Sequence, residues 1–395
     1  MRKRTFPLRG FILLLLCIEF WDEFVYGVRE AAWPLIRDDL GLTYIQIGVL
    51  LGLPAIVSSV VEPVLGILGD VWKRRVLILG GGAFFALSLL LTGISQGMTL
   101  LLLSFILFYP ASGAFVSLSQ ASLMDTAPGR REQNMARWTL AGSLGVVSGP
   151  LALSAAMALS LGWRGVYLVS AMLTVVLLIP AWRAFYSNGV ESASDSEEAS
   201  PDFFAGIREA LRALRRWAVL RWLILLSFSD LMLDVLLGYL ALYMVDVARV
   251  SSAQAATAVA VWTGVGLLGD FLLIPFLERV PGLRYLRVSA GLELALFAGF
   301  LIIPAFGWKL LFLALLGFFN AGWYSILKAR LYATMPGRSG IVMAVDNLFG
   351  IVNSLIPLGL GLVAQHAGLS VAMPLLAAGP VALLIGLPRR DTKEE

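Results

Sequence analysis

Three carboxylic acids lie close together in an apolar stretch near the start of the chain. Glu19, Asp22 and Glu23 are spaced at i, i+3 and i+4, and Tyr26 continues the face that a helix would give them. Three carboxylates inside a membrane cannot all be ionised without compensating charge, so we predict that at least one loads and releases a proton. In the alternative interpretation, a cation such as Arg29 pairs with these acids, and they only hold helices together.

A second acidic pair lies in the other half of the chain. Asp230 and Asp234 are one helical turn apart in an apolar stretch, and 208 positions separate Asp22 from Asp230. We expect this pair to share the role of the first group, which is to bind protons or a substrate. Trp21, Tyr239 and Trp262 lie at similar depth, where aromatic rings either stack on a cationic or amphipathic substrate or pack among helices.

Further polar residues lie nearer the expected cytoplasmic side. The offset of 208 also relates Glu62 to Asp270, and each is two turns inside a predicted helix. Glu62 and Asp270 either carry coupled protons or lock an inner gate. In the second case they would bond to the fifth or the eleventh of the apolar runs given below. Asp346 and Asn353 share one face of the eleventh run and either line the cavity or serve packing.

Glu293 belongs to the ninth apolar run. We expect it to meet lipid headgroups or Lys328.

The composition identifies a membrane protein. Of the 395 residues, 59% are hydrophobic and only 14% are charged, and the mean hydropathy is +0.84. In a soluble domain, roughly a quarter of the residues are charged. The chain has no Ser-His-Asp set, no cysteine pair, no Walker loop and no dinucleotide fingerprint. We therefore expect a transporter driven by a gradient and not an enzyme, with no cofactor, no bound metal and no nucleic acid partner.

The apolar runs long enough to cross a bilayer form two sets of six. They predict an all-α membrane protein with two six-helix bundles, 1–183 and 219–395, joined by a cytoplasmic linker over 184–218. The linker begins with a Ser- and Glu-rich stretch, and its residues 203–218 have the spacing of a basic amphipathic helix on the inner membrane surface. The alternative is a plain extension of the seventh span. The predicted spans are 9–33, 43–69, 76–95, 99–124, 136–160, 164–183, 219–247, 253–277, 285–306, 309–332, 341–366 and 371–388.

The cations predict the orientation. Most Lys and Arg residues fall at the span ends that lie on the same side as the two termini, so we expect both termini in the cytoplasm and the protein in a bacterial inner membrane. The other side keeps only Arg29, Arg37, Arg164, Arg249 and Lys309.

An internal repeat relates the two halves. The offset of 208 that relates the acids also relates Gln46 to Gln254 and the stretch 126–130 to 334–338. One ungapped offset over the first four spans of each half indicates a duplicated six-helix unit. Parallel repeats of this kind place the substrate cavity between the halves, near the middle of the membrane.

Several motifs give the chain a family resemblance. The pattern Gly66-x-x-x-Asp70-x-x-x-Arg74-Arg75, with Lys73 where the family usually has Gly, resembles the loop signature of the major facilitator superfamily. The resemblance implies that Asp70 with Arg74, and Glu278 with Arg279, act as inner-gate charge relays. Gly145, Gly149 and Pro150 are similar to the helix-kink motif of its antiporter branches.

These observations together predict a proton-coupled antiporter of the multidrug-efflux type, working by alternating access. We expect it to export a small organic cation or an amphipathic drug-like compound, and to act as a monomer among lipids. The alternatives are a divalent metal transporter and a transporter that takes up a neutral nutrient or metabolite. Anionic substrates fit least, because the middle of the membrane offers acids and few cations.

Overall fold

The structure is a computed structural model, and it describes residues 8–71, 73–126, 131–187, 212–277, 279–334, 345–346 and 349–388. These residues form helices and connecting turns, with no strand among them. The chain divides into two compact units, Met1–Glu198 and Ala199–Glu395. The predicted linker stays a prediction over most of its length, because residues 188–211 lie outside the described part of the chain.

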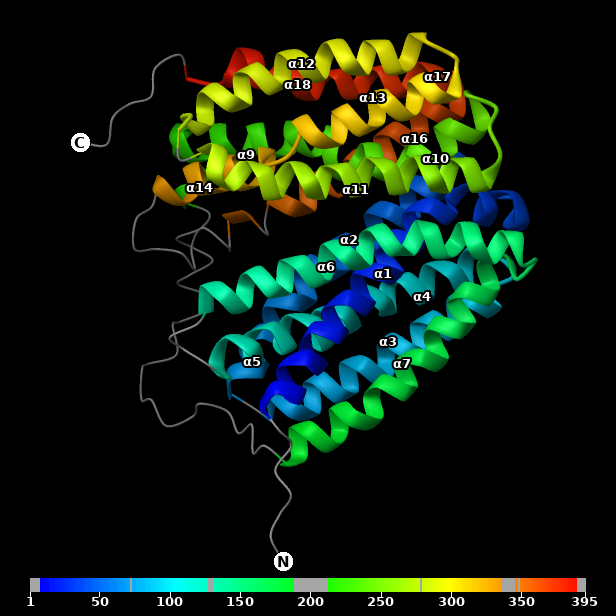
Figure 1. The fold of residues 1–395 in the computed structure, drawn as a ribbon, viewed down its shortest axis with the longest axis vertical. Coiled ribbons are helices and arrows are strands. Elements are labelled where there is room, and N and C mark those ends of the chain that lie inside the picture. Colours follow the sequence, from blue (N-terminus) through cyan, green and yellow to red (C-terminus); the bar gives the residue numbers. More distant parts are fainter. Residues whose placement is uncertain are drawn as a thin grey trace, which may run out of the picture. The chain divides into compact units, whose positions relative to one another are not determined.

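The first unit contains six spans (Figure 1). The fourth span is continuous but changes from α to π geometry and back, through the π-helical segment η1 (Gly113–Ser117). The α-helices of this unit are α1 (Leu8–Leu40), α2 (Tyr44–Val71), α3 (Arg74–Ile94), α4 (Met98–Ser112), α5 (Leu118–Thr126), α6 (Arg131–Ala158) and α7 (Gly162–Ser187).

The second unit also contains six spans. Its first span includes the π-helical segment η3 (Leu231–Val235), and its fourth is interrupted between α13 and α14. The α-helices are α9 (Trp217–Asp230), α10 (Leu236–Asp246), α11 (Ser252–Leu277), α12 (Gly282–Ile302), α13 (Phe306–Phe319), α14 (Trp323–Ala333), α16 (Ile356–Ala367), α17 (Leu369–Ala372) and α18 (Ala378–Gly386), with a 3₁₀ segment over Met373–Ala377.

Helix length and hydropathy agree with the predicted membrane fold. Eleven helical stretches of the described chain are long and apolar enough to cross a membrane. The helix α1 is not among them, although it has 33 residues, because Glu19, Asp22 and Glu23 put too many charged residues into its apolar stretch. With α1 the spans number six in each unit, which confirms the predicted all-α membrane fold.

The predicted amphipathic helix is described only at its C-terminal end, and residues 203–211 stay a prediction. Arg212 and Ala213 are helical, Leu214 and Arg215 form a turn, and Arg216 is extended with φ −84° and ψ 118°. The extended residue interrupts the helix, so that α9 begins at Trp217. Arg215 and Arg216 stay exposed at this turn.

The internal repeat has a counterpart in local structure. The backbone N–H of Thr43 donates to Gln46 Oε1 (2.8 Å), and the N–H of Gln46 donates to Thr43 Oγ1 (3.2 Å). Ser251 and Gln254 make the same reciprocal pair, at 3.0 and 3.2 Å. Each pair is a capping box that satisfies two backbone donors at the start of a helix. Both halves therefore begin their second span by the same device, 208 positions apart.

The helices α1 and α6 pack backbone against backbone (Figure 1). A Cβ atom at Gly145 would collide with the backbone oxygen of Phe20, and one at Gly149 would collide with that of Phe24. Small residues at such contacts let membrane helices approach closely. The structure shows α6 as one uninterrupted helix, so close packing is the observed role of these glycines, and the kink at Pro150 stays a prediction.

A glycine-to-alanine pair tests this packing. Gly145→Ala should lower the free energy of unfolding by about 1–3 kcal/mol, because overpacking a filled contact costs that much. Gly80→Ala on α3 is the matched control, since open space surrounds Gly80 and alanine favours a helix by about 1 kcal/mol. Thermal melting in detergent measures both variants, and equal melting temperatures would contradict the tight α1–α6 contact.

Candidate functional site

The acids of α1 point to different neighbours. Glu19 and Glu23 lie beside α6, where Gly142 leaves room for them: a Cβ there would be 2.6 Å from Glu19 Oε1 and 3.3 Å from Glu23 Cγ. Asp22 instead accepts a hydrogen bond of 2.8 Å from Ser112 Oγ at the end of α4. The cause is helical geometry. Each residue advances about 100° around the helix axis, so Asp22 at i+3 and Glu23 at i+4 fall on opposite sides of Glu19.

Arg29 makes its ion pair with the residue next to it. Its Nε and Nη2 donate to Glu30 Oε1 at 2.8 and 2.6 Å, and its Nη1 donates to Tyr109 Oη at 2.7 Å. The guanidinium also lies over the rings of Tyr26 and Tyr109, at 4.7 and 5.2 Å from their centroids. The alternative in which Arg29 pairs directly with the α1 acids is therefore wrong.

Glu30 was not among the predicted site residues. Both Arg29 and Glu30 are buried, and Trp33 Nε1 contacts the second carboxylate oxygen of Glu30 at 3.4 Å. The signal for this pair was present in the sequence, since Arg29 and Glu30 are consecutive residues of opposite charge inside a span. Removal of either partner of such a buried, hydrogen-bonded pair would leave an uncompensated buried charge.

Trp21 joins α1 to α7. Its indole Nε1 donates to Thr174 Oγ1 at 2.9 Å, and its ring stacks on Phe24 with a centroid distance of 4.9 Å. The side chain is half-buried, so part of the ring stays accessible. Stacking of Trp21 on a substrate stays a prediction, and the structure adds a packing role.

The acids of the seventh span lie at the start of the π-helical segment η3 and within it. Asp230 lies just before η3 and Asp234 within it, and their carboxyl groups are within hydrogen-bonding reach of each other. Asp234 is exposed and Asp230 is half-buried. One turn earlier, Ser227 Oγ donates to Asn353 Oδ1 at 2.6 Å. This bond brings Asn353 of the eleventh span to the seventh span.

Tyr239 and Trp262 are both buried in the second unit. The hydroxyl group of Tyr239 donates to the backbone oxygen of Pro357 at 2.7 Å. The indole nitrogen of Trp262 is buried without a hydrogen-bond partner among the described residues. Both rings therefore serve packing in this conformation.

Glu62 and Asp270 each have a partner within their own unit. Glu62 accepts a hydrogen bond from Ser58 on its own helix and lies against Gly113 of the fourth span. Asp270 accepts one of 3.0 Å from the backbone N–H of Gly322, in the tenth span. These contacts arise because α2 and α11 pack on the helices of the fourth and tenth spans. The bonds to the fifth or the eleventh span would join the two units, and they stay predictions.

Lys328 and Asp346 form an ion pair that links the tenth and eleventh spans. Asp346 was predicted as a cavity or gate residue, and the sequence did not identify Lys328 as its partner.

The inner-gate motif is described only in part. Gly66 and Asp70 fall within α2, but the side chain of Asp70 and the whole of Glu278 are outside the described part of the structure. Arg74 is buried at the start of α3, and the Arg75 guanidinium lies 4.7 Å from the ring centroid of Tyr186. The charge relays of these residues therefore stay predictions.

Glu293 is a buried acid in α12. Its side chain is fully enclosed, and neither carboxyl oxygen has a hydrogen-bond partner among the described residues. The prediction that it meets headgroups or Lys328 is wrong, because Lys328 pairs with Asp346. Hydropathy does not distinguish a helix face against lipid from one against protein, because both surroundings are apolar.

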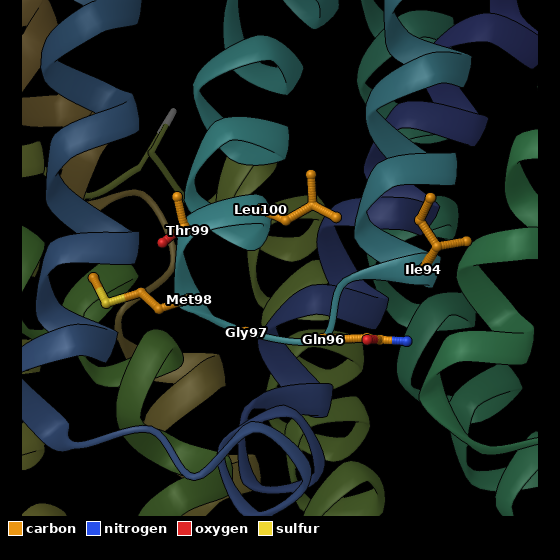
Figure 2. Close-up of a pocket in the computed structure, with 6 residues that line it drawn as sticks. All are labelled: Ile94, Gln96, Gly97, Met98, Thr99 and Leu100. Carbon is orange, nitrogen blue, oxygen red and sulfur yellow. The ribbon is translucent and has the colours of Figure 1, made fainter.

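A pocket of about 470 Å³ lies where α3 turns into α4, and it is separate from these acids (Figure 2). None of the predicted site residues lines it. Its lining residues are Ile94, Gln96, Gly97, Met98, Thr99 and Leu100.

Comparison with known proteins identifies the family. The model of the Major Facilitator Superfamily matches residues 12–357, which is most of the chain. The chain belongs to this superfamily. The family and the fold are those of secondary transporters, which are not enzymes. This confirms the resemblance to the superfamily and the prediction that the protein is not an enzyme.

Curated relatives of the superfamily match over nearly their whole length. The fosmidomycin resistance protein of Escherichia coli is 23% identical over 381 residues, with 94% of this chain and 91% of the relative covered. The MFS-type transporter YfnC of Bacillus subtilis is 24% identical over 370 residues, with coverage of 91% and 88%.

Solved structures of the superfamily share the fold. A bacterial homologue of the human lysosomal transporter Spinster, inward-facing and occupied, has a TM-score of 0.72 and 16% identity, covering 97% of this chain and 95% of that one. The nucleoside transporter NupG has a TM-score of 0.74 and 14% identity, with coverage of 96% and 98%.

Replacement of Glu293 tests its burial. Glu293→Leu should raise the free energy of unfolding by about 1–3 kcal/mol, because it removes an unsatisfied buried polar group. Glu293→Gln keeps a polar side chain of the same shape and should gain less. Thermal melting in detergent compares both with the parent protein. A lower melting temperature for the leucine variant would mean that the carboxyl group has a stabilising partner.

Proposed function

We propose that this transporter exports small organic cations or amphipathic drug-like compounds in exchange for protons. The observation that carries the proposal is the environment of the α1 acids. Glu19 and Glu23 share the space over Gly142, and Glu19 is buried there.

Two neighbouring carboxyl groups in a span ionise with difficulty, which favours proton exchange there. Glu19 is only 7% exposed, and Glu23 lies one turn further along the same face. Asp22 accepts a hydrogen bond from a hydroxyl group, Ser112 Oγ. Asp230 and Asp234 supply a second acidic pair, one repeat away. These five acids are the proposed proton and cation sites.

The divergence of the α1 acids favours an organic cation over a divalent metal. A metal ion needs several oxygens converging at about 2.0–2.6 Å. Glu19 and Glu23 face α6, whereas Asp22 is held toward α4. An extended cation with aromatic or apolar parts suits such a spread of acids, with Trp21 and Tyr26 on the same helix.

The proposed direction of transport, export, rests on the name of a relative. The E. coli protein that matches over most of the chain is named for resistance to a drug, and resistance is a consequence expected of export. We also propose, from the distribution of Lys and Arg, that both termini are cytoplasmic and that the membrane is a bacterial inner membrane. Action as a monomer belongs to the same proposal.

Isosteric amides test the proton coupling. Asp22→Asn and Asp230→Asn should abolish accumulation of tetraphenylphosphonium driven by a proton gradient in proteoliposomes, because an amide cannot carry the proton. Exchange of labelled for unlabelled cation should survive, since it moves no net proton. Asp38→Asn, at the exposed end of the same helix, is the control. Normal accumulation in both variants would place the coupling on other residues.

Replacement of Trp21 tests the class of substrate. Trp21→Leu should weaken binding of tetraphenylphosphonium by roughly 2- to 30-fold, the equivalent of a cation–aromatic contact of about 0.5–2 kcal/mol. Binding of Mn²⁺ should not change. Thr174→Val is the matched control, because it removes the Trp21 hydrogen bond and leaves the ring.

Binding measurements on purified protein with tetraphenylphosphonium, Mn²⁺ and a neutral sugar decide between the alternatives. Binding of Mn²⁺ alone would favour a metal transporter. Binding of the sugar alone would favour uptake of a neutral metabolite, and either result would contradict the proposed substrate class.

A further inference from the structure

The tenth span is interrupted in the middle of the second unit. The helix α13 ends at Phe319, Asn320 to Gly322 form a turn, and α14 begins at Trp323 (Figure 1). Gly322 has φ +72°, a left-handed conformation that other residues rarely adopt. A Cβ there would also collide with Leu273 of α11. Both the turn and its close contact with α11 therefore depend on glycine.

Three neighbouring spans make hydrogen bonds with the residues of this break, two of them to its backbone and one to the side chain of Asn320. Asp270 of α11 accepts the N–H of Gly322 at 3.0 Å. The Tyr285 hydroxyl of α12 lies 3.1 Å from the oxygen of Phe319 and 3.0 Å from that of Ala321. On the third side, Asn320 Nδ2 donates to the oxygen of Met232, within η3, at 3.4 Å. Backbone groups that an interrupted helix leaves open inside a membrane must find such partners.

The first unit repeats this arrangement with different chemistry. Counting back 208 positions from Asp270 gives Glu62, and from Ala321 it gives Gly113. The Glu62 side chain lies against Gly113, where a Cβ would be 2.9 Å from Glu62 Cγ, and Gly113 begins the π-helical segment η1. In each half, a carboxyl group of the second span thus meets the irregular segment of the fourth span.

We propose that Asp270 is a positioning residue for the transport cycle and holds the hinge of the tenth span at Asn320 to Gly322. Its carboxylate caps the N-terminus of α14 through Gly322, and Tyr285 fixes the carbonyl groups on the other side of the break. Movement of α11 is thereby transmitted to α14. The inference rests on the transport cycle of the family and not on the proposed substrate or its direction.

Hydrogen exchange of the Gly322 amide measures the cap without any substrate. Asp270→Leu removes the acceptor and should speed exchange in peptides that contain Gly322 by about tenfold or more, because the amide loses its protecting bond. Asp270→Asn keeps an amide oxygen as acceptor and should exchange nearly like the parent. Thr263→Val on the same helix is the control, since that hydroxyl bonds only to the backbone of its own helix.

A second variant and a transport measurement connect the cap to the cycle. Tyr285→Phe removes the hydroxyl from the other side of the break without touching Asp270. Asp270→Leu and Tyr285→Phe should each lower the turnover of tetraphenylphosphonium severalfold, with the apparent KM unchanged. Asp270→Asn and Thr263→Val should retain the parent turnover.

The outcomes separate this inference from the proposed function. Unchanged exchange at Gly322 in Asp270→Leu would overturn the cap, and parent turnover in both Asp270→Leu and Tyr285→Phe would overturn the hinge. An equal loss of turnover in Asp270→Asn and Asp270→Leu would also overturn the hinge, because the charge of Asp270 and not its hydrogen bond would then matter. If the parent protein does not transport the cation at all, the proposed substrate fails, and exchange at Gly322 still decides the cap.

Discussion

The close approach of α1 to α6 is the contact on which the candidate site of the first unit depends. Gly145 and Gly149 bring the two backbones together, and Gly142 leaves the space that Glu19 and Glu23 occupy. A larger residue at these positions would separate the helices and expel the acids from the interface. Packing in a membrane relies on such contacts, because lipid tails provide no hydrophobic force between helices. The glycines of α6 therefore set the environment of the acids on α1.

The position of each acid then follows from the helix and from the neighbours it meets. Glu19 and Glu23 share one neighbour, and Asp22 faces another, Ser112. Arg29 forms its ion pair with the next residue, Glu30. A membrane interior penalises a lone charge, so a buried cation such as Arg29 needs a partner of this kind close to it.

Hydropathy and spacing were sufficient for the fold but not for the contacts within it. The twelve spans, the two halves and the offset of 208 could be read from apolar runs and from repeated acids. The π-helical segments and the break at Gly322 could not, because they depend on tertiary packing and not on local propensity. Partners were also missed: Arg29 pairs with Glu30, Asp270 caps α14, and Glu293 is buried in the protein where lipid headgroups were expected.

The two halves share backbone devices and differ in their charges. The capping boxes at Gln46 and Gln254 match, and Glu62 and Asp270 both meet the irregular part of a fourth span.

The ion pairs do not repeat. The positions equivalent to Arg29 and Glu30 are Leu237 and Gly238, and those equivalent to Lys328 and Asp346 are Gln120 and Trp138. The matched capping boxes and the matched contacts of Glu62 and Asp270 are features that the duplicated six-helix unit has kept. The unrepeated ion pairs are where the two halves have become different, whereas the acids that the repeat relates, Asp22 and Asp230, are proposed to share one role in both halves.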